Sequence, residues 1–364
     1  MARKDNRARF LKALKEHDRA IYRAFMRATN DAANAASGFK VNEALRKALQ
    51  NGFFTESDLD EVMRALGLGP EMFDGVQKAV EDAFRGGAAY HIASAPKALQ
   101  GGLELAFQGY HPRIIEWLGE NAARRVAEVS EPMREAVRTT ITRGMEQQRG
   151  YAKIKLDLVG RMDGNRRVGG VIGLLDREAG YVADFRDALS GLHVGVTSKG
   201  VKKFWIKEDG TLGTVYSDTT RDRRFDRTIV KAIREGKPLP AETIENAASR
   251  YSAGLLRERG RRIARTEGNR AMAAGRAEHI AQMIDRGEAE AGDITKTWRH
   301  TARPGQRDNH AAMSGESRPW GERYSNGMMR PHEEGAPASE VVNCACVEIT
   351  STDWVAVAKR RGTF

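Results

Sequence analysis

The chain has 364 residues, of which 40% are hydrophobic and 30% are charged. Its mean hydropathy is -0.57, and its longest apolar run, "GGVIGLL", is far shorter than a bilayer span. We therefore expect a globular protein of roughly two or three domains that does not cross a membrane and has no membrane partner.

The charge balance is strongly basic, with 60 Lys and Arg residues against 49 Asp and Glu residues and a formal net charge of +11. Such an excess is typical of proteins that meet a polyanion, most often nucleic acid. Acidic residues are interspersed among the basic ones, so a solvated surface with a basic bias is the alternative. The start "MARKDNRARFLKALKEHDRA" lacks the apolar block of a secretory signal, and the chain holds only 2 cysteines, so we expect residence in a reducing cytoplasm.

Residues 1–150 are predicted to form a helical region. Phe10, Leu14, Ile21 and Phe25 recur at spacings that place them on one face of a helix. This apolar stripe should dock in a groove, either of the helical region itself or of a partner.

Capping residues predict helix boundaries within this region. Thr55, followed by Asp58, predicts the start of a short helix. Ser130 as an N-cap, with Pro132 in the first turn, predicts the start of another.

Residues 151–240 differ in composition and predict a small mixed α/β element. They contain the glycine cluster "MDGNRRVGGVIG" and the β-like run "KKFWIKEDGTLGTVYSD", which has a turn at Asp209-Gly210. A long helix is predicted to follow Pro240 and to end at Gly287, with Gly260 as a candidate break.

Residues 241–364 add two predicted strands after that helix. Alternation places Ile294, Lys296 and Trp298 on one face of the first strand. The stretch "VVNCACVEI" predicts the second, with Cys344 and Cys346 on the same face. The expected fold class is therefore α+β and predominantly α-helical, with a helical N-terminal region followed by a small mixed C-terminal domain.

Cys344 and Cys346 are candidate metal ligands, because residues at i and i+2 of a strand point to the same side. Zinc would need two further ligands, and His310 and His332 are the histidines nearest in sequence that could supply them. The spacing matches no standard zinc pattern, and small thiols are common in protein cores. We therefore expect buried thiols with no metal and no cofactor, and keep these four residues as the alternative metal site.

Arg307 and His310 would lie on one side of a helical turn, where a guanidinium and an imidazole could serve phosphodiester chemistry. The sequence offers no carboxylate pair with metal-ligand spacing, no nucleophile motif and no second well-placed base. The alternative is a framework role, in which Arg307 bonds loop carbonyls or a carboxylate and His310 donates to the backbone. We favour the framework, and expect no catalytic residues and no enzyme activity.

The densest basic stretch is "RERGRRIARTEGNRAMAAGRAE". Arg257, Arg261 and Arg262 are candidates for weak, non-specific contacts with the phosphates of double-stranded DNA, and a solvated helix face is the alternative. Arg265 and Glu267 are expected to be structural.

Four segments, "IARTEGNRA", "KTWRHT", "RDNHAAMSGE" and "NCACVEI", resemble in order and spacing the phage Mu F-like minor head protein family, also called head morphogenesis proteins. The resemblance covers roughly residues 165–350 and implies that residues 241–364 hold the family's domain. Many members carry an aspartate shortly after the tryptophan strand, where this chain reads "HTARPGQRD". The positions that match the family motifs, for which it implies structural roles, are Arg265, Thr266, Glu267, Trp298, Arg307, His310, Asn343, Cys344 and Cys346.

The resemblance also implies a function. It implies a phage minor capsid protein, an internal, low-copy, portal-associated structural component of the virion that takes part in head morphogenesis and in DNA packaging or DNA ejection. Its partners would be the portal protein, the procapsid and double-stranded DNA, and it would lie in the capsid interior and, during assembly, in the host cytoplasm. The alternative is a nuclease or transferase effector delivered with the phage genome.

Overall fold

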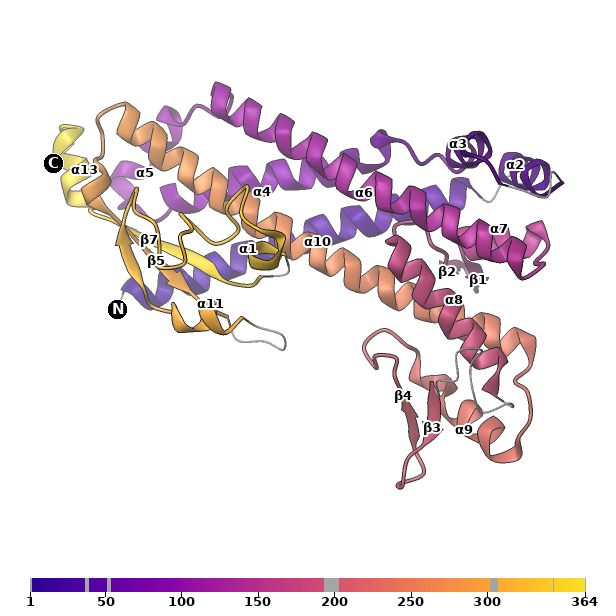
Figure 1. The fold of residues 1–364 in the computed structure, drawn as a ribbon. Helices are drawn as coiled ribbons and strands as arrows, with labels where there is room; N and C mark the ends of the chain where they lie inside the picture. The colour runs from indigo at the N-terminus through magenta and orange to yellow at the C-terminus, as the bar shows by residue number, and fades with distance from the viewer. Residues whose placement is uncertain are drawn as a thin grey trace. The chain divides into compact units, whose positions relative to one another are not determined.

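The structure is a computed structural model, and it describes residues 2–36, 39–50, 54–192, 203–301, 307–342 and 344–363. Most described residues are helical and the strands form small sheets, which confirms the predominantly α-helical α+β class (Figure 1). The longer helices are α1 (Ala2–Ala35), α2 (Phe39–Gln50), α3 (Glu56–Ala65), α4 (Asp74–Ile92), α5 (Lys97–Ala106), α6 (Pro112–Glu146), α7 (Tyr151–Val159), α8 (Asp176–Ser190), α9 (Asp226–Glu235) and α10 (Ala241–Asp285). The short C-terminal helices are α11 (Asp308–Ala312), α12 (Ala338–Val341) and α13 (Trp354–Arg360).

Every strand pairing described is antiparallel. Two hairpins join β1 (Arg161–Asp163) to β2 (Arg166–Val168) and β3 (Phe204–Ile206) to β4 (Leu212–Thr214). The third sheet has the order β6-β5-β7 and consists of β5 (Ile294–Arg299), β6 (Ser317–Pro319) and β7 (Val347–Thr352).

Contacts divide the chain into two compact units, each built from separated segments. Unit 1 comprises Met1–Phe25, Asp74–Ala123 and Arg261–Phe364. Unit 2 comprises Met26–Phe73 and Arg124–Gly260. The boundaries predicted after residues 150 and 240 both fall inside unit 2, and the helices α1, α6 and α10 each contribute to both units.

The predicted apolar stripe of the N-terminal helix is buried within this chain. Phe10, Leu14, Ile21 and Phe25 are all buried, and the ring of Phe10 packs edge-on against that of Tyr90 in α4, with centroids 5.0 Å apart. The sequence left open whether the stripe docks in its own chain or in a partner, and in the structure it packs against its own chain.

Of the two helix starts predicted from capping residues, one is confirmed and one is wrong. The capping box of Thr55 and Asp58 at the start of α3 is confirmed. The predicted helix start at Ser130 is wrong, because α6 runs without interruption through Pro132. Proline costs a helix one backbone hydrogen bond, but Met133 and Val137 on the following turns are fully buried, and this packing outweighs the loss.

The long helix α10 is likewise continuous through Gly260, the candidate break. In unit 1, α10 and α4 approach so closely that glycine is required at the contact. A Cβ at Gly275 would lie 1.8 Å from the Phe84 carbonyl oxygen, and one at Gly87 would lie 2.1 Å from that of Met272. These glycines therefore set the distance between two helices rather than ending either of them.

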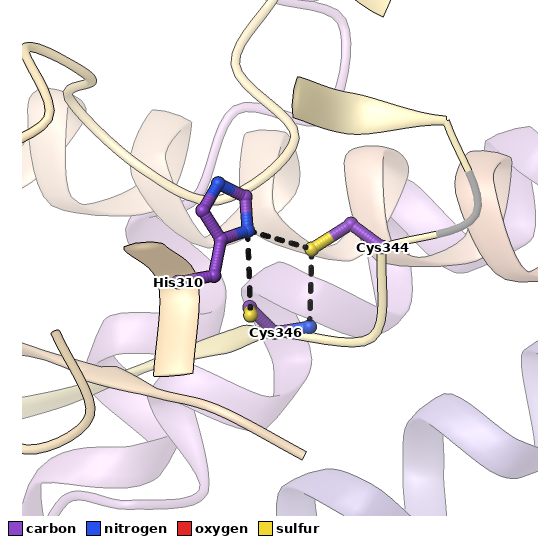
Figure 2. A group of neighbouring side chains, drawn as sticks. All are labelled: His310, Cys344 and Cys346. Carbon is purple, nitrogen blue, oxygen red and sulfur yellow. Dashed lines mark hydrogen bonds between the residues drawn. The ribbon is translucent and has the colours of Figure 1, made fainter. Parts of the chain in front are cut away.

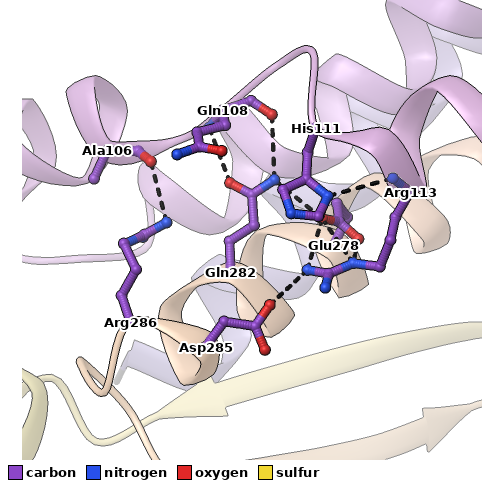
Figure 3. A network of polar contacts seen from close by, with 8 residues as sticks. All are labelled: Ala106, Gln108, His111, Arg113, Glu278, Gln282, Asp285 and Arg286. Atoms are coloured by element: carbon purple, nitrogen blue, oxygen red, sulfur yellow. Dashed lines mark hydrogen bonds and ion pairs between the residues drawn. The ribbon is translucent and has the colours of Figure 1, made fainter.

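A polar network joins the C-terminal half of α10 to the start of α6 and to the segment that precedes α6 (Figure 3). Arg113 contacts Glu278 through Nε at 3.0 Å and Asp285 through Nη2 at 2.8 Å. The side chain of Gln282 accepts a hydrogen bond from the Gln108 backbone N–H at 2.9 Å and donates one to its carbonyl oxygen at 3.2 Å. The end of α10, from which the chain enters the three-stranded sheet, is thereby held in place.

Candidate functional site

The candidate site is a cluster of one histidine and two cysteines in unit 1 (Figure 2). His310 comes from the short helix α11, and Cys344 and Cys346 come from the extended segment between α12 and β7. All three are buried. They belong to a small core that also holds Trp298, Met313, Tyr324, Met328 and Val341.

The predicted strand over "VVNCACVEI" is wrong in its first part. The stretch begins at the end of helix α12, and β7 starts only at Val347. Pro337 precedes α12 and has the φ angle of -53° that suits a helix start. The two cysteines therefore lie in a non-strand segment.

One ring nitrogen of His310 faces both sulfurs. Its Nδ1 lies 3.5 Å from Cys344 Sγ and 3.7 Å from Cys346 Sγ. The three candidate ligand atoms all lie within 4.8 Å of one another. Two sulfurs and an imidazole nitrogen at this separation could hold a soft or borderline metal ion.

The other ring nitrogen of His310 faces a carboxylate. Its Nε2 lies 2.7 Å from Glu340 Oε2, and Asn309 Nδ2 donates to the same oxygen at 3.4 Å. A carboxylate on Nε2 favours a proton there, so Nδ1 is the ring nitrogen that faces the sulfurs. The expectation that His310 donates to the backbone is thus wrong, and Glu340 is a partner that the sequence analysis did not identify.

Arg307 precedes α11 and ties it to the segment that carries Glu340. Its Nε donates to the carbonyl of Ser339, and its Nη2 donates to that of Val342 at 3.1 Å. Arg307 thus bonds backbone carbonyls, as expected, but one of them lies in the short helix α12 rather than in a loop. The family-motif position Asn343 lies outside the described residues, so its side chain has no structural account.

Trp298 supplies one wall of the cluster. It is fully buried, and its indole lies edge-on to His310 and to Tyr324, with ring centroids 5.1 and 5.2 Å away. It also packs in the same buried core as both cysteines. The tryptophan therefore encloses the histidine within the core that holds both thiols.

His332 lies next to the cluster, although outside the 4.8 Å group. It is 2% exposed, and its backbone has a φ of 62°, in the left-handed region that is uncommon for residues other than glycine. Neither ring nitrogen makes a well-formed hydrogen bond to a described residue. It helps to lower the pKa of Cys344, so its imidazole is close to that sulfur.

The two thiols are electrostatically unequal. The hydrogen bond from Cys346, together with that from His310 and the nearby imidazole of His332, lowers the pKa of Cys344 far below its usual value. The hydrogen bond to Cys344, together with burial, raises the pKa of Cys346. The hydrogen bond to Cys344 in turn raises the pKa of His310. The cluster thus favours the thiolate form of Cys344 beside the protonated form of His310.

Buried charges adjoin this cluster. Arg276 belongs to the basic run 257–276 that was expected to contact DNA, but it is 1% exposed, so that expectation is wrong for this residue. Arg276 of α10 donates to Glu348 Oε1 at 2.9 Å, and Tyr324 Oη lies 3.2 Å from Glu348 Oε2. Lys296 donates to the carbonyl of Met329 and lies 4.9 Å from the centre of the Tyr324 ring. In the sequence, the burial of Lys296 is indicated by its position between Ile294 and Trp298, on the apolar face of the strand.

The remaining candidates lie along α10. Arg257 and Arg261 are exposed and Arg262 is partly exposed, so a phosphate could reach all three. Arg265 is partly buried, whereas Thr266 and Glu267 are buried, and Glu267 pairs with Arg270 at 3.3 Å. Of the motif residues on this helix, Thr266 and Glu267 therefore face the protein interior.

No protein-family model, curated protein or solved structure matches the chain. Within the part of the chain that the structure describes, every helix is too short or too polar to traverse a lipid bilayer.

Proposed function

We propose that this protein is a minor head protein of a tailed phage, an internal low-copy component that meets the portal protein and the procapsid during assembly. The resemblance of its sequence motifs to the Mu F-like family is the origin of the proposal. One structural observation supports it most: motif residues that are far apart in sequence, Trp298, His310 and the two cysteines, meet in one buried core.

The burial of these side chains favours a framework over catalysis. His310 is 1% exposed and the two cysteines are 3% and 2% exposed, so a nucleic acid strand or a protein substrate could not reach them without opening the core. Arg307, which could have stabilised a charged oxygen, is engaged with two carbonyl groups. We therefore propose that the protein has no catalytic activity of its own.

The charge of the molecule fits a component that works beside packaged DNA. The formal net charge is +11, and α10 presents Arg257 and Arg261 to solvent. Contacts of this kind are weak and independent of sequence, because phosphates supply the binding energy. Such contacts would let the protein meet DNA during packaging or ejection.

Removal of the gene from the phage or prophage that carries it tests the proposal. We expect fewer DNA-filled heads, restored when the wild-type gene is supplied on a plasmid. Normal yields of infectious particles without the gene would contradict a role in head assembly. Metal-dependent cleavage of DNA or RNA that disappears in His310→Ala would instead support a nuclease effector.

A further inference from the structure

We propose that His310, His332, Cys344 and Cys346 form a zinc site that stabilises the C-terminal part of unit 1. The inference reverses the expectation of buried thiols without metal, and it does not depend on the proposed role in phage heads. The donor set has two sulfurs and two imidazoles, a combination that structural zinc sites use.

The observed distances match the edges of a zinc tetrahedron. Zinc–sulfur bonds of about 2.3 Å and zinc–nitrogen bonds of about 2.0–2.1 Å at tetrahedral angles place nitrogen about 3.6 Å from sulfur. The Nδ1 atom of His310 lies 3.5 and 3.7 Å from the two sulfurs (Figure 2). Both nitrogen–sulfur distances thus already have the length that one shared ion requires.

The surroundings of His310 also fit a metal ligand. Zinc-binding histidines usually donate their second ring N–H to a carboxylate or a carbonyl, which fixes the tautomer and the ring orientation. Glu340 occupies that position, 2.7 Å from Nε2. Arg307 holds the backbone on both sides of Glu340, at Ser339 and Val342, so the carboxylate is fixed by the chain itself.

His332 completes the donor set. A buried imidazole without a good hydrogen bond is destabilising, and the left-handed backbone of His332 adds strain. Coordination by one ring nitrogen would compensate for both. Because His332 lies outside the 4.8 Å group, we expect its side chain to move toward the other three ligands when zinc binds.

Four buried protein ligands leave no coordination position for water or substrate, so the site would be structural rather than catalytic. The ion would join three separate parts of the chain: α11, the loop that holds His332, and the segment before β7. Such a connection suits a region in which regular secondary structure is short, because few backbone hydrogen bonds hold it together.

The first test measures zinc in the full-length protein, purified without a polyhistidine tag. We expect close to one equivalent of zinc by mass spectrometry of the metal. After replacement by cobalt, the spectrum should show thiolate-to-cobalt charge-transfer bands. The cysteine thiols should react with iodoacetamide far faster after a chelator is added. A protein that takes up no zinc on reconstitution, or whose thiols react equally with and without chelator, would overturn the site.

Single substitutions test the individual ligands. Cys346→Ser and His332→Gln should each weaken zinc binding, and Glu340→Gln should weaken it about 10- to 100-fold by loosening His310. His111→Gln is the matched control, since His111 also faces a glutamate, with its Nδ1 3.6 Å from Glu278 Oε1, but lies outside the cluster (Figure 3).

The cobalt spectrum of the wild-type protein keeps the test decisive if a variant fails to fold, because the intensity of its charge-transfer bands reports the number of bound thiolates. Bands from fewer than two thiolates would contradict the joint role of Cys344 and Cys346. Unchanged zinc affinity in a folded His332→Gln protein would overturn the assignment of the fourth ligand.

Discussion

At the scale of single residues, the pair of Arg276 and Glu348 shows how unit 1 accommodates charge in its interior. The two side chains are 1% and 2% exposed, and their nearest atoms are 2.9 Å apart. Arg276 also donates to the backbone carbonyl of Glu348 at 2.7 Å. A buried pair of this kind gains little over apolar side chains of similar size, but removal of one partner leaves a charge unpaired in a low-dielectric interior.

We therefore predict that Arg276→Met lowers the free energy of unfolding by about 3–5 kcal/mol. The double variant Arg276→Met with Glu348→Leu should lose clearly less, because no charge of the pair then remains buried. Urea unfolding of the wild type, both single variants and the double variant measures this. Losses that simply add in the double variant would contradict the coupling.

Asp18 on α1 gives a prediction for pH. Burial raises its pKa to about 7, although Arg265 opposes the shift. The pKa in the folded state is thus above that in the unfolded state, so folding favours the protonated form. The contribution of Asp18 to stability is greatest below about pH 4 and is lost as the pH rises toward 7.

Asp18→Asn removes this titration. Above pH 7 the variant should be more stable than the wild type, by at most about 4 kcal/mol given about 1.4 kcal/mol per pKa unit, and the difference should vanish near pH 4. Unfolding free energies between pH 4 and 8 check this. A constant difference over that range would show that Asp18 does not titrate as stated.

At the scale of elements, α1 derives its stability from the apolar face that its sequence predicts. Phe10 is 2% exposed, contacts Tyr90, and has the Arg276 guanidinium 5.3 Å from the centre of its ring. We predict that Phe10→Ala lowers the unfolding free energy by about 3–5 kcal/mol. Lys12→Ala on the exposed face should change it by less than about 0.5 kcal/mol. Equal effects of both substitutions in urea unfolding would contradict this packing.

Elements with local causes could be predicted from the sequence. The capping box at Thr55 depends on residues within one turn, and the face of α1 depends on helical periodicity. The continuity of α6 through Pro132 and of α10 through Gly260 depends on tertiary packing that no local pattern encodes. The strand predicted from Val341 begins only at Val347, after the short helix α12 (Ala338–Val341). Arg307, distant in sequence, bonds carbonyls within and directly after that helix, at Ser339 and Val342.

The candidate site shows the same division. The sequence identified His310, His332, Cys344 and Cys346 as possible ligands of one metal ion. It could not predict that His310 Nδ1 would lie close to both sulfurs. Glu340 could not have been identified, because nothing in the sequence indicates which acidic residue would meet His310 Nε2. Contacts between residues about thirty positions apart depend on the path of the whole loop.

At the scale of the whole molecule, the basic excess predicts a salt-dependent affinity for DNA. We predict that Arg257→Glu, Arg261→Glu and Arg262→Glu together weaken binding to double-stranded DNA at low salt. They should also flatten the dependence of log K on log salt, which is about −0.9 per phosphate contact. Fluorescence anisotropy at several salt concentrations measures both quantities.

A charge-matched control separates a local effect from a change in net charge. Arg223, Lys231 and Lys237 have side chains that are 71%, 75% and 73% exposed, so their joint change to Glu alters the net charge equally at other surface positions. We expect a smaller loss of affinity for this control. Equal losses would mean that total charge, and not the arginines of α10, governs DNA binding.

The sequence could not predict that each compact unit combines segments from distant parts of the chain. Residues 1–150 read as one helical region, yet they contribute to both compact units. Helical periodicity reports which face of a helix is apolar, but not which distant segment covers it.

The central claim, that the protein is an internal component of a phage head, is tested most directly by counting it in purified particles. The measurement is targeted mass spectrometry of heads treated with nuclease and protease, with the portal protein as the internal standard. We predict a low, reproducible copy number that is protected from protease in intact heads. Absence of the protein from heads, while it is abundant in the lysate that produced them, would contradict the claim.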